Sequence, residues 1–465
     1  MPALLTNIRR AAAFVDRYHW LVLLLAAPAF LFPSPARAPL LLVLPGLWLA
    51  AGVAGRPALP RTPLNAVLLL FSLMLLVSVW TTPDLAYSLP KIAGALLGLG
   101  AYFAVVRVTT EAPQPLAPFW RLVWLFILSG GGLVAIGLVG IDWLNKLPAL
   151  AAISQKLPVF IRGLPGAEEG FSANGVAGVL IFMLPLQVAL LIRTVLHQSP
   201  RAHWYQGDFS NSRYWPKLWP WTLFADPLSR GPQLFIALQI FLLLLVGGLV
   251  LLSQSRGAWL GLAAGLLLMA AAMAWGERRA RWPLLAAAVL GVAALLVVGG
   301  PQSLINLAGR VAGNDIGAKV IQRQALWSYG LLVIRSFPFT GMGLNAFRKA
   351  LPELYPTVPL PAGFDITHVH NHLLQAAINF GLPGLVAYLG LWLGAAFALV
   401  KAHQASSDPW LRAAALGLSA GLVAEFVYGT TDVIDTGAKL GLFFWLALAL
   451  SISLYQVGSA RAASH

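Results

Sequence analysis

Apolar residues recur along almost the whole chain in runs of about 18 to 25, the length that an α-helix needs to cross roughly 30 Å of hydrocarbon. Charged residues gather between these runs and are almost absent inside them. The pattern predicts an all-α integral membrane protein with about 12 transmembrane helices. The expected spans are residues 20–32, 39–55, 64–80, 90–106, 119–140, 174–193, 232–252, 257–275, 283–300, 373–400, 411–428 and 437–456.

The composition agrees with this pattern and excludes a soluble fold. Of the 465 residues, 59% are hydrophobic and 10% are charged. One or two soluble cores could not hide so much apolar surface, so lipid must cover the rest. We therefore expect residues 1–465 to form a single polytopic membrane domain. The chain has no cysteine, so neither disulfides nor thiolate metal ligands are available.

The net charge of +15 carries information about topology. Basic residues are more frequent in alternate short loops, which predicts that both termini and the basic loop 194–231 are cytoplasmic. Two long loops, 141–173 and the larger 301–372, then face the periplasm. Val320 to Phe337 has helical character, so the larger loop should be partly helical and end its helix at Pro338. Membrane lipids are the expected acidic partners, and we expect no nucleic-acid partner.

The chemistry concentrates where the loop 301–372 meets the next span. His368, His370 and His372 lie within five residues, and histidine is the side chain best suited to proton transfer near neutral pH. Asn371 precedes an apolar run, so it is the expected N-cap of a helix whose free N–H groups could bind an anion. With Gln375 in support, the segment predicts a general base beside an anion site.

Two other interpretations of this segment stay open. The polar residues could simply cap the helix at the membrane interface. Alternatively, an extended segment would place His368, His370 and His372 on one face, as in a metal site. Against the metal site, the sequence shows no second cluster of carboxylates outside the membrane, and His372 is expected to start the helix and turn away. We therefore expect no metal.

Basic residues on the periplasmic side run against the positive-inside trend. Arg256 lies in a very short hairpin between two spans, where an unpaired charge is costly. Lys319 and Arg323 are one helical turn apart and should repel each other unless an anion joins them. Together with Arg162, they could bind pyrophosphate, because guanidinium groups bind phosphate oxygens in pairs. Any one of them could instead be an interfacial arginine reaching toward lipid headgroups.

Carboxylates are few on this side of the membrane. Asp432 and Asp435, in the short last periplasmic loop, could orient a histidine or an arginine. Glu425 is the main charged residue inside the expected spans. Transport of a charged substrate predicts ionisable residues within the spans, so their scarcity favours an enzyme with its site at one face.

These features, in this order, resemble the O-antigen ligase and polymerase superfamily over roughly residues 170–400. The residues that carry the resemblance are Ser255-Arg256-Gly257, Arg323, Trp327, Pro338, Gly341-Met342-Gly343, His368-Val369-His370-Asn371 and Gly381-Leu382-Pro383-Gly384. Each motif alone is loose, whereas their order and their placement against the spans are more specific.

The resemblance implies a metal-independent, inverting glycosyltransferase of the bacterial inner membrane that uses no cofactor. Its donor would be a glycan on undecaprenyl pyrophosphate, and its acceptor a sugar hydroxyl of lipid A–core. Carried onto this chain, His370 is the base, with His368 second, while Arg256 and Arg323, with Arg162 and Lys319, would bind the departing pyrophosphate. A polymerase, with a second undecaprenyl-linked glycan as acceptor, is the related alternative. A transporter or flippase of a lipid-linked anion is the alternative from another class.

Overall fold

The structure, a computed structural model, describes residues 2–143, 147–161, 163, 170–197, 232–276, 314–356 and 368–462. In these ranges the chain is almost wholly helical, which confirms the predicted all-α architecture. The two strands found there are only two residues long, β1 (Ile141–Asp142) and β2 (Phe171–Ser172), and they pair in parallel. Nine of the described helices are long and apolar enough to cross a membrane, and a bent pair at the N-terminus could supply a tenth span.

The helices of the described ranges lie in both halves of the chain. In the first half they are α1 (Pro2–Arg17), α2 (His19–Leu31), η1 (Pro35–Leu42), α3 (Val43–Val53), α4 (Asn65–Thr81), α5 (Leu85–Thr110), α6 (Leu116–Gly140), α7 (Pro148–Ser154) and α8 (Ala173–His197). In the second half they are α10 (Pro232–Leu252), α11 (Arg256–Gly276), α13 (Asn314–Ser336), α14 (Phe347–Leu354), α15 (His372–Ala405), α16 (Pro409–Gly429), η4 (Lys439–Gly441) and α17 (Leu442–Ala462). Every predicted span on described residues coincides with a helix or with a helix and its adjoining 3₁₀ turn. The span predicted at 283–300 lies outside the described residues, as does nearly all of loop 194–231.

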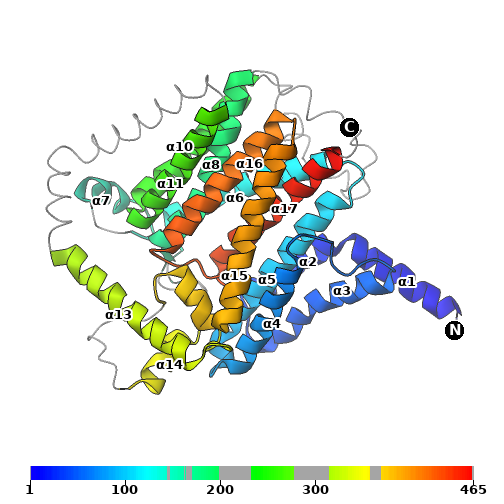
Figure 1. The fold of residues 1–465 in the computed structure, drawn as a ribbon, viewed down its shortest axis with the longest axis horizontal. Coiled ribbons are helices and arrows are strands. Elements are labelled where there is room, and N and C mark those ends of the chain that lie inside the picture. The colour runs from blue at the N-terminus through cyan, green and yellow to red at the C-terminus, as the bar shows by residue number, and fades with distance from the viewer. Residues whose placement is uncertain are drawn as a thin grey trace.

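The long helices run side by side as a bundle (Figure 1). Small residues allow close contact where apolar surface alone gives no preference between helix and lipid. On α11, Gly257, Gly261 and Gly265 share one face, and a Cβ on any of them would collide with Thr431 or with a backbone oxygen of α16. Helix α11 is therefore held directly against α16, and its first residue, Arg256, is brought to the end of α16.

A smaller unit covers one end of the bundle. We call it the cap and define it as residues 314–356 and 368–371, which include α13 and α14 (Figure 1). It has a hydrophobic core separate from that of the bundle, formed mainly by Leu326, Val333, Met342, Ala346, Phe347, Ala350, Leu351 and Val369, with Ile378 from α15. The cap is joined to the bundle by polar contacts: Leu344 N–H donates to Ser78 Oγ at 2.6 Å, and Lys349 pairs with Asp84.

Helix α15 is broken near the cap. Gly381 has φ 70° and ψ 180°, a conformation open to glycine and strained for other residues. The turn 341–343 fills the break: Met342 N–H donates to Ile378 O at 2.7 Å, and Leu382 N–H donates to Pro338 O at 2.6 Å. The two glycine motifs noted in the sequence are thus the two sides of one contact, which locks the cap to the first turns of α15.

Candidate active site

The histidine segment leads into α15 and is held in a fixed conformation. Asn371 is the N-cap of α15, as predicted, and its Oδ1 accepts hydrogen bonds from the N–H groups of Leu373 and Leu374 at 3.0 and 3.1 Å. His370 has φ +48°, which is unusual for a residue other than glycine. Residues in such conformations persist where their surroundings fix them, and they concentrate at functional sites.

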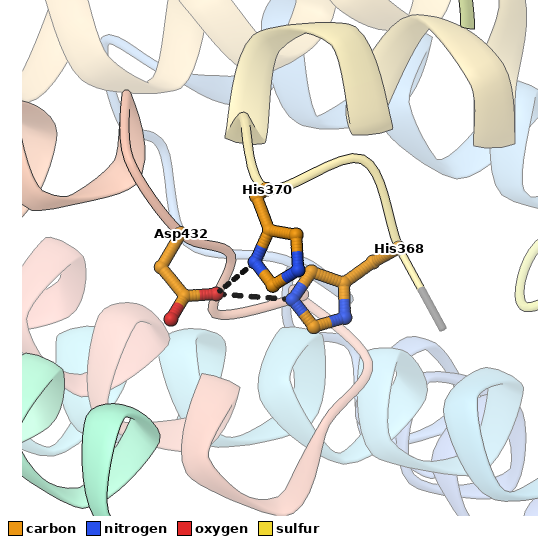
Figure 2. Close-up of side chains that lie close together, drawn as sticks. All are labelled: His368, His370 and Asp432. Carbon is orange, nitrogen blue, oxygen red and sulfur yellow. Dashed lines mark hydrogen bonds and ion pairs between the residues drawn. The ribbon is translucent and has the colours of Figure 1, made fainter. Parts of the chain in front are cut away.

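His368 and His370 meet Asp432, which follows the end of α16. The Oδ1 atom of Asp432 lies 3.0 Å from His368 Nε2 and 3.1 Å from His370 Nδ1, and it also accepts a hydrogen bond from Val433 N–H at 2.9 Å. Figure 2 shows both imidazole rings turned toward this one oxygen. A single carboxylate therefore orients both histidines, which is the role that the sequence suggested for Asp432.

Asp432 keeps its charge in this environment. Burial alone would raise the pKa of Asp432, but hydrogen bonds and charge interactions with His368 and His370 outweigh it and hold the pKa well below its usual range. The carboxylate can accept hydrogen bonds only, so the facing nitrogens, His368 Nε2 and His370 Nδ1, carry their protons. The lone pair of His370 is then on Nε2, on the far side of the ring, where it can accept a proton from a substrate.

His372 does not belong to this group. It is the first residue of α15 and is buried in the bundle, with its Nδ1 3.0 Å from the Tyr388 hydroxyl and its ring packed against Trp392 and Phe426. The metal site with His368, His370 and His372 on one face is therefore wrong.

A different set of three residues has the spacing of a metal site. The ligand atoms of His368, His370 and Asp432 lie within 4.8 Å of one another, and catalytic zinc commonly has three protein ligands. The same distances are those of direct hydrogen bonds from the histidines to the carboxylate. The arrangement thus suits an orienting carboxylate without an ion, and chelation distinguishes the two forms experimentally.

The predicted phosphate-binding arginines differ in how the structure places them. Arg256 is exposed at the first position of α11, next to Gly257, which packs on Thr431 beside Asp432. Arg323 is half-buried on α13, and its charge acts on the Tyr428 hydroxyl at the end of α16. Neither arginine forms an ion pair with any residue in the ranges that the structure describes. Their part in binding an anion stays a prediction.

The two other predicted basic residues cannot be placed in the site. Arg162 lies outside the described residues, and Lys319 lies on α13 with a side chain that is not among those described. Their proposed part in binding pyrophosphate stays a prediction.

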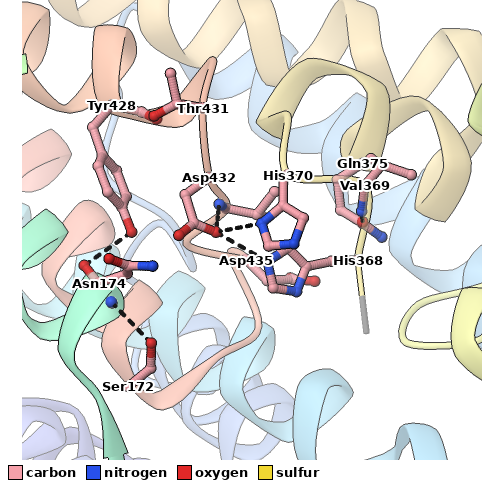
Figure 3. A network of polar contacts seen from close by, with 12 residues as sticks. Ser172, Asn174, His368, Val369, His370, Gln375, Tyr428, Thr431, Asp432 and Asp435 are labelled. Atoms are coloured by element: carbon pink, nitrogen blue, oxygen red, sulfur yellow. Dashed lines mark hydrogen bonds and ion pairs between the residues drawn. The ribbon is translucent and has the colours of Figure 1, made fainter. Parts of the chain in front are cut away.

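Three helices begin around the histidines and Asp432. Tyr428 donates its hydroxyl proton to Asn174 O, in the first turn of α8, at 2.9 Å. Gly257 brings the start of α11 to the same segment, and Gly429 packs against the ring of His372 at the start of α15. Figure 3 shows how the α8 side, with Ser172 and Asn174, faces the histidine segment across Asp432. Helix N-termini carry partial positive charge, so the site suits a substrate with negative charge.

Several functional contacts were not predicted from the sequence. Gln375 was expected only in a supporting part, and in the structure its Oε1 accepts a hydrogen bond from Val369 N–H at 3.1 Å. Trp327 Nε1 donates to Val369 O at 2.9 Å, which connects α13 to the histidine segment. Asn379 was missed, although its position one turn after Gln375 on the same helix face was visible in the sequence.

One comparison with known protein families gives a match over part of the chain. Residues 240–389 match the family model described as O-antigen ligase. The match includes Arg256, Arg323 and the histidine segment, while Asp432 lies beyond its end. No curated protein matches the chain. Over residues 240–389 the chain is therefore similar to the O-antigen ligase family.

Proposed function

We propose that this protein is an O-antigen ligase that transfers a glycan from undecaprenyl pyrophosphate to a sugar hydroxyl of lipid A–core. The observation that carries the proposal is His370 held by Asp432, with the α11 start at Arg256 packed near Thr431 and the charge of Arg323 acting on Tyr428 at the end of α16. It combines a base with positive groups for a leaving anion, and it lies largely within the part of the chain that matches the family.

The transfer requires one proton movement and one displacement. His370 Nε2 takes the proton of the acceptor hydroxyl as the acceptor oxygen attacks the anomeric carbon. The bond from that carbon to the pyrophosphate oxygen breaks, and its electrons leave with the undecaprenyl pyrophosphate. Because attack and departure occur on opposite faces of the sugar, the product has inverted configuration.

Asp432 and the arginines stabilise the charges that form. As the imidazole becomes imidazolium, its Nδ1–H remains hydrogen-bonded to the Asp432 carboxylate, so the new positive charge lies next to a negative one. Arg256 and Arg323, with the N-termini of α8, α11 and α15, would neutralise the departing pyrophosphate. In this proposal these groups take the part that a metal ion has in many phosphate-releasing enzymes.

The distribution of charge supports a periplasmic site. Basic residues such as Arg56, Arg61, Arg193 and Arg412 lie near the helix ends opposite the histidines. Basic residues are retained on the cytoplasmic side, so the opposite end would face the cytoplasm together with both termini. The glycan would then be assembled and moved across the membrane before transfer, and both lipid-linked substrates would enter sideways from the bilayer.

One reconstitution separates the related activities. Purified protein is incubated in EDTA with an undecaprenyl-pyrophosphate glycan, with and without lipid A–core, and the products are separated by size. A ligase attaches the glycan to lipid A–core and makes nothing when that acceptor is absent. Longer lipid-linked glycans without lipid A–core would identify a polymerase instead, and a glycan moved across a vesicle membrane without transfer would identify a flippase.

A further inference from the structure

The residue between the two histidines is held by a hydrogen bond at each of its two peptide groups. Val369 is fully buried in the core of the cap. Its N–H donates to Gln375 Oε1 and its carbonyl accepts from Trp327 Nε1. The N–H belongs to the peptide group that follows His368, and the carbonyl to the one that precedes His370, so neither peptide group can rotate without breaking a hydrogen bond. The side chain of Gln375 therefore helps to set the directions in which His368 and His370 leave the backbone.

Gln375 is the first member of a chain of buried polar groups. Its Nε2 donates to Asn379 Oδ1 at 2.9 Å, and Asn379 Nδ2 donates to Asp435 Oδ2 at 3.2 Å. Both amide side chains are at most 4% exposed. Asp435 is held in turn by Gly437 N–H at 3.0 Å and by Lys91 Nζ at 3.7 Å.

The residues at both ends of this hydrogen-bonded series determine which amide atoms donate and which accept. Val369 N–H can only donate, so Gln375 must present its oxygen there and its NH₂ group to Asn379. Asn379 then accepts with its oxygen and presents its own NH₂ group to Asp435. An ionised carboxylate accepts only, so this arrangement satisfies each group, and reversing either amide would bring two donors or two acceptors together.

This series of hydrogen bonds connects the same two segments as the contact of Asp432 with the histidines does. Asp435 and Asp432 belong to one short connection between α16 and η4, and Figure 3 shows both near the histidine segment. Asp432 binds the imidazole rings, whereas Asp435 acts on the backbone through two amides. Two separate links between two segments fix their distance and their relative rotation, which one link alone would leave free.

We propose that Gln375, Asn379 and Asp435 form a positioning relay that holds the His368–His370 segment at hydrogen-bonding distance from Asp432. The relay rests on the proposed function, because its effect is on the base of that reaction. None of its three members is required to touch the substrate. Its contribution is to keep His370 in its unusual backbone conformation and its Nδ1 directed at the carboxylate.

The polarity of the relay provides a sharp test. Asn379→Asp brings two acceptors together, one from residue 379 and one from Asp435. Asp435→Asn brings two donors together, because Gly437 N–H holds the new amide oxygen and leaves the NH₂ group facing Asn379. The double substitution Asn379→Asp/Asp435→Asn exchanges the carboxylate and the amide, so the contacts of residue 379 with Gln375 and with residue 435 each have one donor and one acceptor again. Only the ion pair of position 435 with Lys91 is lost, and Lys91 is partly exposed to solvent. The net charge of the double variant equals that of the wild type.

We expect each single substitution to lower kcat and the double substitution to raise it again. A displacement of about 1 Å at a reacting group costs on the order of 10²-fold in rate, so each single variant should lose kcat by about that factor. The KM values for donor and acceptor should change by less than about twofold, because the substrate-binding arginines are not moved. The double variant should regain most of the lost kcat.

Asn345→Asp is the matched control. Asn345 also donates its side-chain amide to a neighbour, Tyr87 O at 3.0 Å, but has no link to the histidines. It should keep nearly full kcat although it undergoes the same chemical change in the cap. Melting temperatures are measured for all variants, so that a loss of kcat is interpreted only where the protein stays folded. If Asn379→Asp does not fold, Asp435→Asn and the double variant still test the relay.

His370→Ala is assayed in parallel to separate the two proposals. Wild-type kcat in Asn379→Asp and Asp435→Asn overturns the relay, as does a double variant no better than the worse single variant. If His370→Ala is inactive in the same assay, the proposed function stands without the relay. If His370→Ala is fully active, the assignment of the base fails first.

Discussion

Replacing Asp432 with asparagine removes one negative charge and little else. Asp432 Oδ1 accepts from His368 Nε2, His370 Nδ1 and Val433 N–H. Because the backbone N–H requires an acceptor at that place, the asparagine oxygen is expected to stay there and to keep both histidines in the same tautomer. The substitution therefore tests charge with the geometry retained.

The size of the effect follows from the bond that strengthens during the reaction. A hydrogen bond to a charged group contributes about 1.5–3 kcal/mol, and a neutral one about 0.5–1.5 kcal/mol. In the transition state the asparagine at position 432 still accepts from the imidazolium, but a neutral amide replaces the counter-charge. We expect this change to cost about 1–2 kcal/mol, or roughly 5- to 30-fold in kcat. A much larger loss, near 10⁴-fold, is expected only if the amide reverses and imposes the wrong tautomer on His370.

The assay is kcat at saturating donor and acceptor, measured across pH. The pKa of Asp432 is held well below its usual range, so its carboxylate stays ionised in mild acid and the fall in rate on acidification reflects another group. The control is Asp142→Asn, the same change at an exposed residue of β1. Full kcat in Asp432→Asn, or an equal loss in the control, would refute the reasoning.

Three other predictions follow from the site and the packing around it. His370→Ala should lower transfer by about 10²–10⁴-fold at unchanged protein level, because the proposed general base is lost, and His368→Ala should be milder; equal activity of the two variants would contradict this assignment. Arg256→Lys and Arg323→Lys should each lose roughly tenfold or more in kcat/KM for the donor but not for the acceptor, because an ammonium lacks the paired donors of a guanidinium; full activity of both would identify them as interfacial anchors. Gly261→Ala should lower the free energy of unfolding by about 1–3 kcal/mol, because its Cβ collides with Ala424 O, as a lower melting temperature in a fixed detergent would show.

The spans and the main site segment could be predicted because each has a local signal. A membrane-length apolar run needs no knowledge of its neighbours, and Asn371 before such a run identifies a helix start. Helix α1 was not predicted, because its apolar residues alternate with Asn7, Arg9 and Arg10 and never form a run of that length. In the structure it is bent by 70° from α2, and buried Asp16 pairs with Arg107 and Arg56 near the bend.

The contacts that assemble the site could not be predicted, because they join residues far apart in the chain. The sequence suggests that Asp432 could orient a histidine or an arginine, but nothing near it identifies His368, 64 positions away, as the partner. The same holds for Asp435 and Asn379. In the alternative of a histidine metal site, proximity in sequence favours His372 as the third ligand, whereas the helix that starts there turns its side chain into the bundle.

The separate core of the cap gives the two sides of the site different cooperative units. Val369 is buried in the cap, and Asp432 is attached to the bundle through α16. Segments with their own core can open by local unfolding without loss of the whole fold. Opening of the cap would separate both histidines from their carboxylate at once, so activity would be lost before the helices of the bundle unfold. A substrate that contacts both sides would oppose this opening by mass action, and the amides of α13 and α14 should then exchange with solvent more slowly in its presence.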